Sequence, residues 1–169
     1  MVEAFVFETM IANDDSESMT ASRSVNLRNK LREVEHFLSV HDHGMPRSYK
    51  EWVQSSKVKA LLYRLSGDYN PLHSDSTVAA MAGFNRPILH GLCTLGFAIR
   101  AIIRSVCNGN PTVVRSIFAR FLLHVFPGET LITEIWIEGP KIIYQTKVKE
   151  RNKVVLLGCV MLNHIGSSL

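Results

Sequence analysis

The sequence lacks the features of membrane, secreted and disulfide-stabilised proteins. Its longest apolar stretch, residues 154–162, is interrupted by Gly158 and falls well short of the roughly 20 apolar residues that span a bilayer. No basic segment followed by an apolar one stands at the start, so we expect no secretory signal. The three cysteines are odd in number and far apart, which predicts neither a disulfide framework nor a metal knuckle, and indicates reduced thiols in an intracellular compartment.

The sequence also lacks a large excess of charge of either sign. Nineteen Lys and Arg residues against fifteen Asp and Glu residues leave a net charge of +4. The basic residues are scattered instead of following one face between aromatic residues, so we expect no nucleic-acid partner. The 169 residues are 46% hydrophobic and 20% charged, which is typical of an ordinary globular domain and excludes a largely disordered chain.

The chain changes character near residue 50. We divide it into an unassigned N-terminal arm, residues 1–50, and a domain, residues 51–169. Apolar residues recur at helical spacing in the arm, among basic residues: Leu27, Leu31, Val34 and Leu38. This pattern predicts an amphipathic segment that is either a solvated or poorly ordered helix or one that serves targeting or partner binding.

From residue 51 onward, helical patterns give way to strand patterns. We predict helices from Ser55 or Ser56 to Gly67, around residues 77–82, and from Gly91 to about residue 106. Apolar residues cover a broad face of the last helix, as in a helix enclosed by other structure. Strands are predicted at residues 113–126, 130–138, 141–149 and 154–164, with tight turns that force antiparallel pairing. The pattern predicts an α+β fold in which an antiparallel sheet wraps around one long central helix.

Two loops carry residues suited to chemistry. Asp68 and His73 are five residues apart, a spacing that a regular helix or strand would place on different faces. A turn at Asn70-Pro71 can bring both to the same side, where a carboxylate and an imidazole that share one water form an acid–base pair. The alternative is a purely structural turn, in which Asp68 accepts hydrogen bonds from nearby backbone N–H groups and His73 is a partly buried packing residue.

The second loop ends where the enclosed helix is expected to begin. The N–H group of Gly91 would be an unsatisfied donor at the positive end of that helix, and it could hold a developing oxyanion. Alternatively, Gly91 only lets the chain bend. The neighbouring His90 could support other residues of the site or cap the helix.

Two groups of residues raise the question of a metal. Asp75 follows His73 by two residues, and His41-Asp42-His43 precedes Gly44. The second group is typical of a turn and has no third ligand nearby. We therefore expect no metal site.

Residues 63–73 together with residues 83–91 resemble the hydratase 2 signature of the MaoC-like, hot-dog-fold family. The matching runs are residues 61–73, 87–93 and 126–130, and the likeness extends from about residue 54 to residue 169. The resemblance implies a hot-dog fold that adds water to trans-2-enoyl-CoA and forms (3R)-3-hydroxyacyl-CoA, with no cofactor because CoA belongs to the substrate. It also implies that Asp68 and His73 activate one water, that Asn70 orients the site, and that Gly91 supplies the oxyanion donor.

The resemblance extends to partners and location. Eukaryotic members carry two hot-dog repeats, and residues 1–50 do not resemble the first of them. Because a lone unit exposes a sheet edge, we expect a homodimer or pairing with a second hot-dog repeat. The end Ser167-Ser168-Leu169 resembles a peroxisomal address with a different middle residue, which predicts a peroxisomal enzyme of fatty-acid β-oxidation.

Some residues and alternatives are less specific. Candidates for contact with the substrate are Arg86, His90 and Arg120. The alternative functions are a truncated, inactive acyl-CoA-binding module and a hot-dog dehydratase or thioesterase that acts on another acyl thioester.

Overall fold

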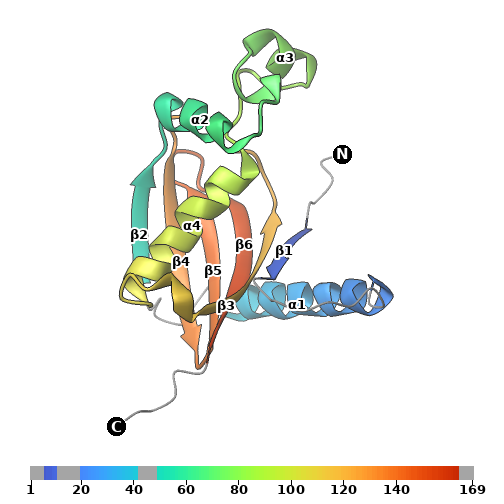
Figure 1. Cartoon of the computed structure of the whole chain (residues 1–169), viewed down its shortest axis with the longest axis vertical. Helices are drawn as coiled ribbons and strands as arrows, with labels where there is room; N and C mark the ends of the chain where they lie inside the picture. Colours follow the sequence, from blue (N-terminus) through green and yellow to red (C-terminus); the bar gives the residue numbers. More distant parts are fainter. Residues whose placement is uncertain (1–5, 11–19, 42–48, 164–169) are drawn as a thin grey trace.

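A six-stranded antiparallel sheet, in the order β1-β3-β6-β5-β4-β2, is the frame of the molecule (Figure 1). The structure is a computed structural model that describes residues 6–10, 20–41 and 49–163. The strands are β1 (Val6–Met10), β2 (Tyr49–Gln54), β3 (Val114–Phe121), β4 (Thr130–Glu138), β5 (Lys141–Val148) and β6 (Lys153–Leu162). The four predicted strands are confirmed as β3 to β6, and β1 and β2 add one strand to each edge.

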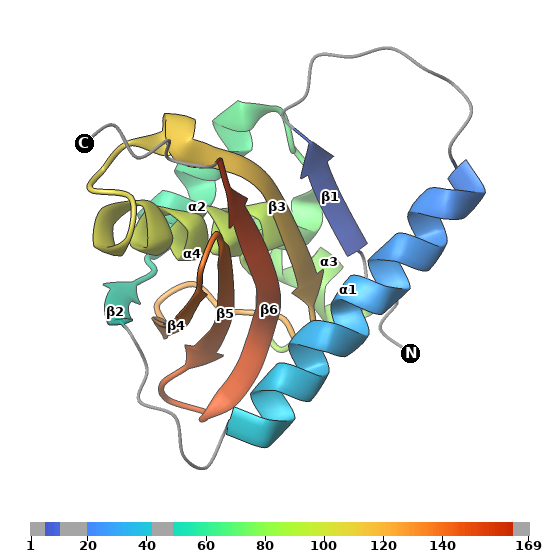
Figure 2. The ribbon, with the colours of Figure 1, turned by 90° about the horizontal axis from the view of Figure 1, so that it is seen from below.

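The sheet curves around helix α4 (Gly91–Ser105), which lies across one of its faces (Figures 1 and 2). Ala98 and Ile102 of the helix are fully buried against a core that includes Ile142 and Tyr144 of β5. Small side chains on the helix let the strands approach, and the apolar face of the helix is covered as its pattern predicted. The predicted α+β hot-dog arrangement, a sheet wrapped around one long helix, is confirmed.

Helix α1 (Thr20–His41) covers the opposite face of the sheet (Figure 2). Val34 and Phe37 are buried against alternate residues of the strands, including Ile143, and Phe37 meets the Trp136 ring edge-on at 6.1 Å. The expectation of a solvated helix is wrong because this face of α1 fills the outer side of the sheet. Both α1 and β1 contact the sheet, and the division of the chain at residue 50 stays a prediction.

Short elements connect β2 to α4 and form the end of the molecule above the sheet in Figure 1. Helix α2 (Lys57–Tyr63) begins at Ser56, whose side chain accepts a hydrogen bond from the Lys59 N–H at 3.2 Å. It continues as the 3₁₀ turn η1 (Arg64–Ser66) and ends at Gly67, whose φ of 107° favours glycine. The 3₁₀ turn η2 (Pro71–His73) and helix α3 (Ser76–Met81) follow. A last 3₁₀ turn, η3 (Pro111–Val113), leads from α4 into β3.

The structure describes all three cysteines and the helices that were considered for a membrane span. Cys93, Cys107 and Cys159 are buried and form no disulfide, as predicted. Within the described ranges, no helix combines the length and the apolar character needed to cross a membrane.

Candidate active site

The loop from Asp68 to His73 is held in one conformation by its own side chains. Asp68 Oδ1 accepts a hydrogen bond from the Asn70 N–H at 3.2 Å, and Asn70 Oδ1 accepts one from the Leu72 N–H at 3.0 Å. Asn70 thereby caps η2, in which Pro71 takes the first position. Arg64 ties the loop to η1 by hydrogen bonds to the Tyr69 carbonyl, at 3.1 Å, and to the Ser74 hydroxyl. The hydrogen bonds expected of a structural turn at Asp68 are therefore present.

Asp68 and His73 are brought together as the turn predicted. An Asp68 carboxylate oxygen and one ring nitrogen from each of His73 and His90 all lie within 4.8 Å of one another. Two hydrogen bonds of about 2.8 Å each can span up to about 5.6 Å, so one water can bridge the carboxylate and an imidazole. The geometric condition for a shared water is met, and the catalytic role of the pair stays a prediction.

A backbone carbonyl determines which His73 nitrogen is available for chemistry. His73 Nδ1 lies 2.9 Å from the Ile88 carbonyl oxygen, which can only accept. Nδ1 therefore carries the proton in the neutral ring, and Nε2 keeps the lone pair. That tautomer suits a group that receives a proton from a bound water.

The buried His90 contacts both Asp68 and His73. Its side chain is 2% exposed, its ring stacks on His73 with centroids 3.7 Å apart, and its Nε2 lies 3.3 Å from the Asp68 carbonyl oxygen. Burial and then the nearby His73 lower the pKa of His90, so the ring is neutral and donates from Nε2. His90 is the N-cap residue of α4, as one alternative predicted; its carbonyl accepts a hydrogen bond from the Thr94 N–H at 3.1 Å, and its side chain makes no cap bond.

The stacked rings also bear on the question of a metal. Asp68, His73 and His90 offer one ligand atom each within 4.8 Å of one another, a spacing that could hold a metal ion, although the two rings are stacked with their planes inclined by only 26°. Asp75, the other candidate, instead caps α3 by accepting hydrogen bonds from Thr77 and Val78 N–H groups. His41-Asp42-His43 lies outside the side chains that the structure describes. The expectation of a site without a metal stays a prediction.

A cavity of about 460 Å³ opens beside these groups. Asp68, His73, His90 and Gly91 line its polar part. The remaining lining is mainly apolar and includes Leu72, Phe84, Ile88, Leu89, Leu92, Phe121, Leu122, Leu123 and Val125. The cavity therefore offers an apolar compartment to a ligand whose reactive end lies at the Asp68–His73 pair.

Gly91 is the first residue of α4, where an N–H group has no acceptor within the helix. A Cβ atom at this position would lie 3.3 Å from the ring of Phe121, which also lines the cavity. Glycine avoids this close contact, and Gly91 and Phe121 lie side by side in the cavity wall. The arrangement suits the predicted oxyanion donor.

An ion pair that the sequence does not reveal fixes the segment that follows His124 and Val125, two residues of the cavity wall. Arg151 pairs with both oxygens of the buried Glu129 at 2.7 and 2.9 Å, and it donates to the His124 carbonyl at 2.7 Å. Glu129 also accepts from the Phe126 N–H at 2.7 Å. Although residues 126–130 were part of the recognised motif, nothing in the spacing pointed to Arg151, 22 residues away.

The two arginines predicted to contact the substrate have different surroundings. Arg86 lies over the ring of Phe126 at 4.7 Å and borders a smaller cavity that also contains His73. Arg120 instead pairs with Glu35 of α1 at 2.6 Å and lines none of the cavities described here. Glu35 is thus a partner of the Arg120 guanidinium, and contact of Arg120 with the substrate stays a prediction.

Comparison with known proteins identifies the family. Residues 39–158 match the model of the MaoC like domain. The chain belongs to the MaoC-like domain family. Over 111 residues it is 70% identical to the Arabidopsis thaliana protein named peroxisomal enoyl-CoA hydratase 2, and the match covers 66% of this chain and 36% of that protein. This chain thus spans about a third of the length of that relative.

Solved structures agree with this assignment of the MaoC-like fold. The full-length peroxisomal multifunctional enzyme type 2 from Drosophila melanogaster matches with a TM-score of 0.69 and 41% identity, over 71% of this chain and 23% of the other. A MaoC-like dehydratase from Phytophthora capsici matches with a TM-score of 0.68 and 41% identity, over 71% of this chain and 44% of the other. The resemblance stated from the motifs is confirmed.

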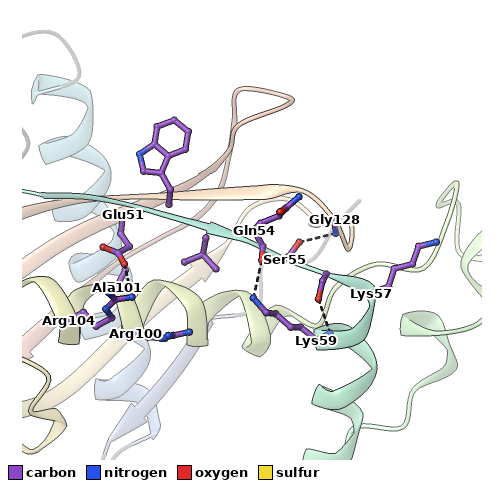
Figure 3. A pocket seen from close by; sticks show the side chains of 12 residues that line it. Glu51, Gln54, Ser55, Lys57, Lys59, Arg100, Ala101, Arg104 and Gly128 are labelled. Atoms are coloured by element: carbon purple, nitrogen blue, oxygen red, sulfur yellow. Dashed lines mark hydrogen bonds and ion pairs between the residues drawn. The ribbon is translucent and has the colours of Figure 1, made fainter.

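A larger groove of about 620 Å³ lies elsewhere on the MaoC-like domain, between β2 and α4 (Figure 3). Arg104 of the helix pairs with Glu51 of the strand at 3.2 Å, and Lys59 donates to the Gln54 carbonyl at 3.2 Å. Neither Asp68 nor His73 lines this groove. The candidate chemistry is therefore in the smaller, apolar cavity at the start of α4.

Proposed function

We propose that this chain is a hydro-lyase that hydrates trans-2-enoyl-CoA to (3R)-3-hydroxyacyl-CoA. The observation that carries the proposal is the meeting of Asp68, His73 and the Gly91 amide at one apolar cavity. The name and 70% identity of the plant relative support the substrate class. A base, a proton donor and an oxyanion donor are the groups that addition of water to an enoyl thioester requires.

The geometry suggests how each group acts. Asp68 and His73 hold one water, and His73 Nε2 accepts a proton as the water oxygen attacks C3. Negative charge then builds on the thioester oxygen, where the Gly91 N–H at the positive end of α4 stabilises it. The proton returns to C2, so the reaction needs no cofactor. General acid–base help contributes roughly 10²- to 10⁴-fold in rate and one oxyanion donor roughly 10²- to 10³-fold.

Asn70 and His90 hold the catalytic groups in position and do not react with the substrate. Asn70 caps the turn that carries His73, and the His90 ring supports both His73 and the Asp68 backbone. The sequence also suggests His90 as a group that contacts the substrate. Its burial and its two contacts favour a positioning role.

We place this reaction in peroxisomal fatty-acid β-oxidation, with a second hot-dog unit as partner. The names of the relatives from Arabidopsis and Drosophila support the location. The predicted address at Ser167-Ser168-Leu169 lies outside the described residues. Partner binding is supported by β2, the last strand of the sheet in the described part of the chain, where Tyr49 and Trp52 are 44% and 50% exposed.

The proposal is tested by the loss of the conjugated enoyl absorbance of crotonyl-CoA. Wild-type protein should hydrate it, and chiral analysis should find the (3R) product. Asp68→Asn should lower kcat at least 100-fold, since it removes a charged partner of the water. Glu138→Gln, at an exposed position on β4, is the matched control and should retain full activity. An S product, or equal rates for wild type and Asp68→Asn, would contradict the proposal, and binding without turnover would favour the acyl-CoA-binding alternative.

A further inference from the structure

His73 stands between two cavities of different character. On one side lies the apolar cavity of about 460 Å³ described above. On the other lies a cavity of about 250 Å³, bordered by α2, by the start of α3 and by residues 86–87. His73 is the residue that lines both, so a ligand at its ring lies next to both cavities.

The second cavity carries positive charge. Lys57 and Arg86 line it together with the hydroxyl groups of Ser74 and Ser76, and none of its described lining residues is a carboxylate. Both cations are exposed, and within the described part of the chain neither is paired with an acid. Such a lining suits an anionic group, whereas the apolar cavity would bind one only at a large cost in desolvation.

Arg86 is held in place without losing its hydrogen-bonding edge. Its guanidinium lies over the Phe126 ring at 4.7 Å, and Arg151 lies near the same ring at 5.6 Å. Because Arg151 is fixed by Glu129, the ring that supports Arg86 belongs to a well-bonded segment. A guanidinium over the face of a ring can still donate N–H hydrogen bonds from its edge, and its planar fork of donors matches phosphate oxygens.

Lys57 lies on the same side, at the start of α2. Figure 3 shows its side chain directed away from Arg100 and Arg104, toward the end of the groove remote from them. In that groove, Arg104 is engaged by Glu51 and Lys59 by the Gln54 carbonyl. Lys57 is therefore a cation near His73 that remains available to a ligand.

We infer that Arg86 and Lys57 bind the phosphates of the CoA moiety, while the acyl chain enters the apolar cavity and the thioester lies at His73. This inference rests on the proposed function and deepens it, because it states which end of the substrate each cavity takes. It singles out Arg86 among the scattered arginines and adds Lys57, which sequence reasoning did not consider.

The test compares ligands that differ only in the phosphate-bearing part. Calorimetric titration with CoA and with pantetheine, which carries no phosphate, should show tighter binding of CoA by the wild type. Arg86→Ala and Lys57→Ala should each weaken CoA binding about tenfold, the effect of one charge-assisted hydrogen bond, and leave pantetheine binding unchanged. Arg86→Lys should recover part of the loss. Arg115→Ala is the matched control, since Arg115 is exposed on β3 and lines none of these cavities.

Three results would overturn the inference: equal binding of CoA and pantetheine by the wild type, unchanged CoA binding in both variants, or an equal loss for both ligands. Hydration of crotonyl-CoA and crotonyl-pantetheine adds a kinetic readout, in which Arg86→Ala should raise KM for the first substrate alone. Wild-type protein that binds CoA with this selectivity but hydrates neither substrate would refute the proposed function and leave the phosphate site standing.

Discussion

Single residues at this site have roles that depend on their protonation. Burial, followed by His73, lowers the pKa of His90, and burial, followed by Arg151, lowers the pKa of His124. In the unfolded chain both rings return toward the ordinary histidine pKa of 6.5. The unfolded state therefore binds more protons below about pH 6.5, and the stability from these neutral rings is lost as the pH falls.

We expect the free energy of unfolding to decrease between pH 7 and pH 5. His90→Phe keeps a ring against His73 but cannot be protonated, so it should flatten this decrease. Denaturant unfolding at several pH values measures the effect, and His36→Asn at an exposed position of α1 is the control. An unchanged pH dependence in His90→Phe would show that His90 is not a source of the loss.

At the scale of elements, the packing between strands depends on one glycine. Gly158 of β6 lies opposite Tyr144 of β5, whose hydroxyl reaches across to the Phe118 carbonyl at 3.1 Å. A Cβ atom at residue 158 would lie 2.9 Å from Tyr144 Cζ and closer still to the Phe118 carbonyl. Since Tyr144 is fully buried, neither neighbour has space to move.

Two glycine substitutions should therefore act in opposite directions. Gly158→Ala should lower the free energy of unfolding by about 1–3 kcal/mol or more, as overpacking does. Gly96→Ala, at an exposed site within α4 that has nothing within 4 Å, should raise it by about 0.5–1 kcal/mol because alanine favours the helix. Thermal or denaturant unfolding compares them, and a stable Gly158→Ala protein would contradict the packing described.

The elements also show what the sequence could and could not predict. Helix α4 and strands β3 to β6 were predicted because their apolar residues follow clear periods over long runs. The sequence does not predict strand β2, because among the described strands it pairs with β4 alone and four of its six residues are exposed, which leaves little apolar pattern. The burial of Val34 and Phe37 could not be predicted, since it depends on the outer face of a sheet formed by distant residues.

The same reasoning applies to the candidate site. The loop residues were found because a turn is needed to bring Asp68 and His73 together, and the spacing shows this. The stacking of His90 on His73 and the Glu129–Arg151 pair join segments 17 and 22 residues apart in the chain. Contacts of this kind follow from the tertiary fold, and no local pattern marks them.

For the whole molecule, the sheet ends at β1 on one side and at β2 on the other. Exposed apolar side chains gather on α2, where Val58, Leu61 and Leu62 are more than half exposed. Together with the half-exposed Trp52 on the β2 edge, they favour association. Light scattering should give about twice the 19.0 kDa chain mass, whereas a monomer that hydrates crotonyl-CoA would contradict the need for a partner.

The central claim is that Asp68 and His73 act together on one water. The most direct test is a double-mutant cycle of kcat for crotonyl-CoA hydration with Asp68→Asn, His73→Gln and the double variant. Groups that serve one water act as a unit, so the double variant should be about as slow as the slower single variant. Losses that multiply fully, as independent sites would give, would contradict the account.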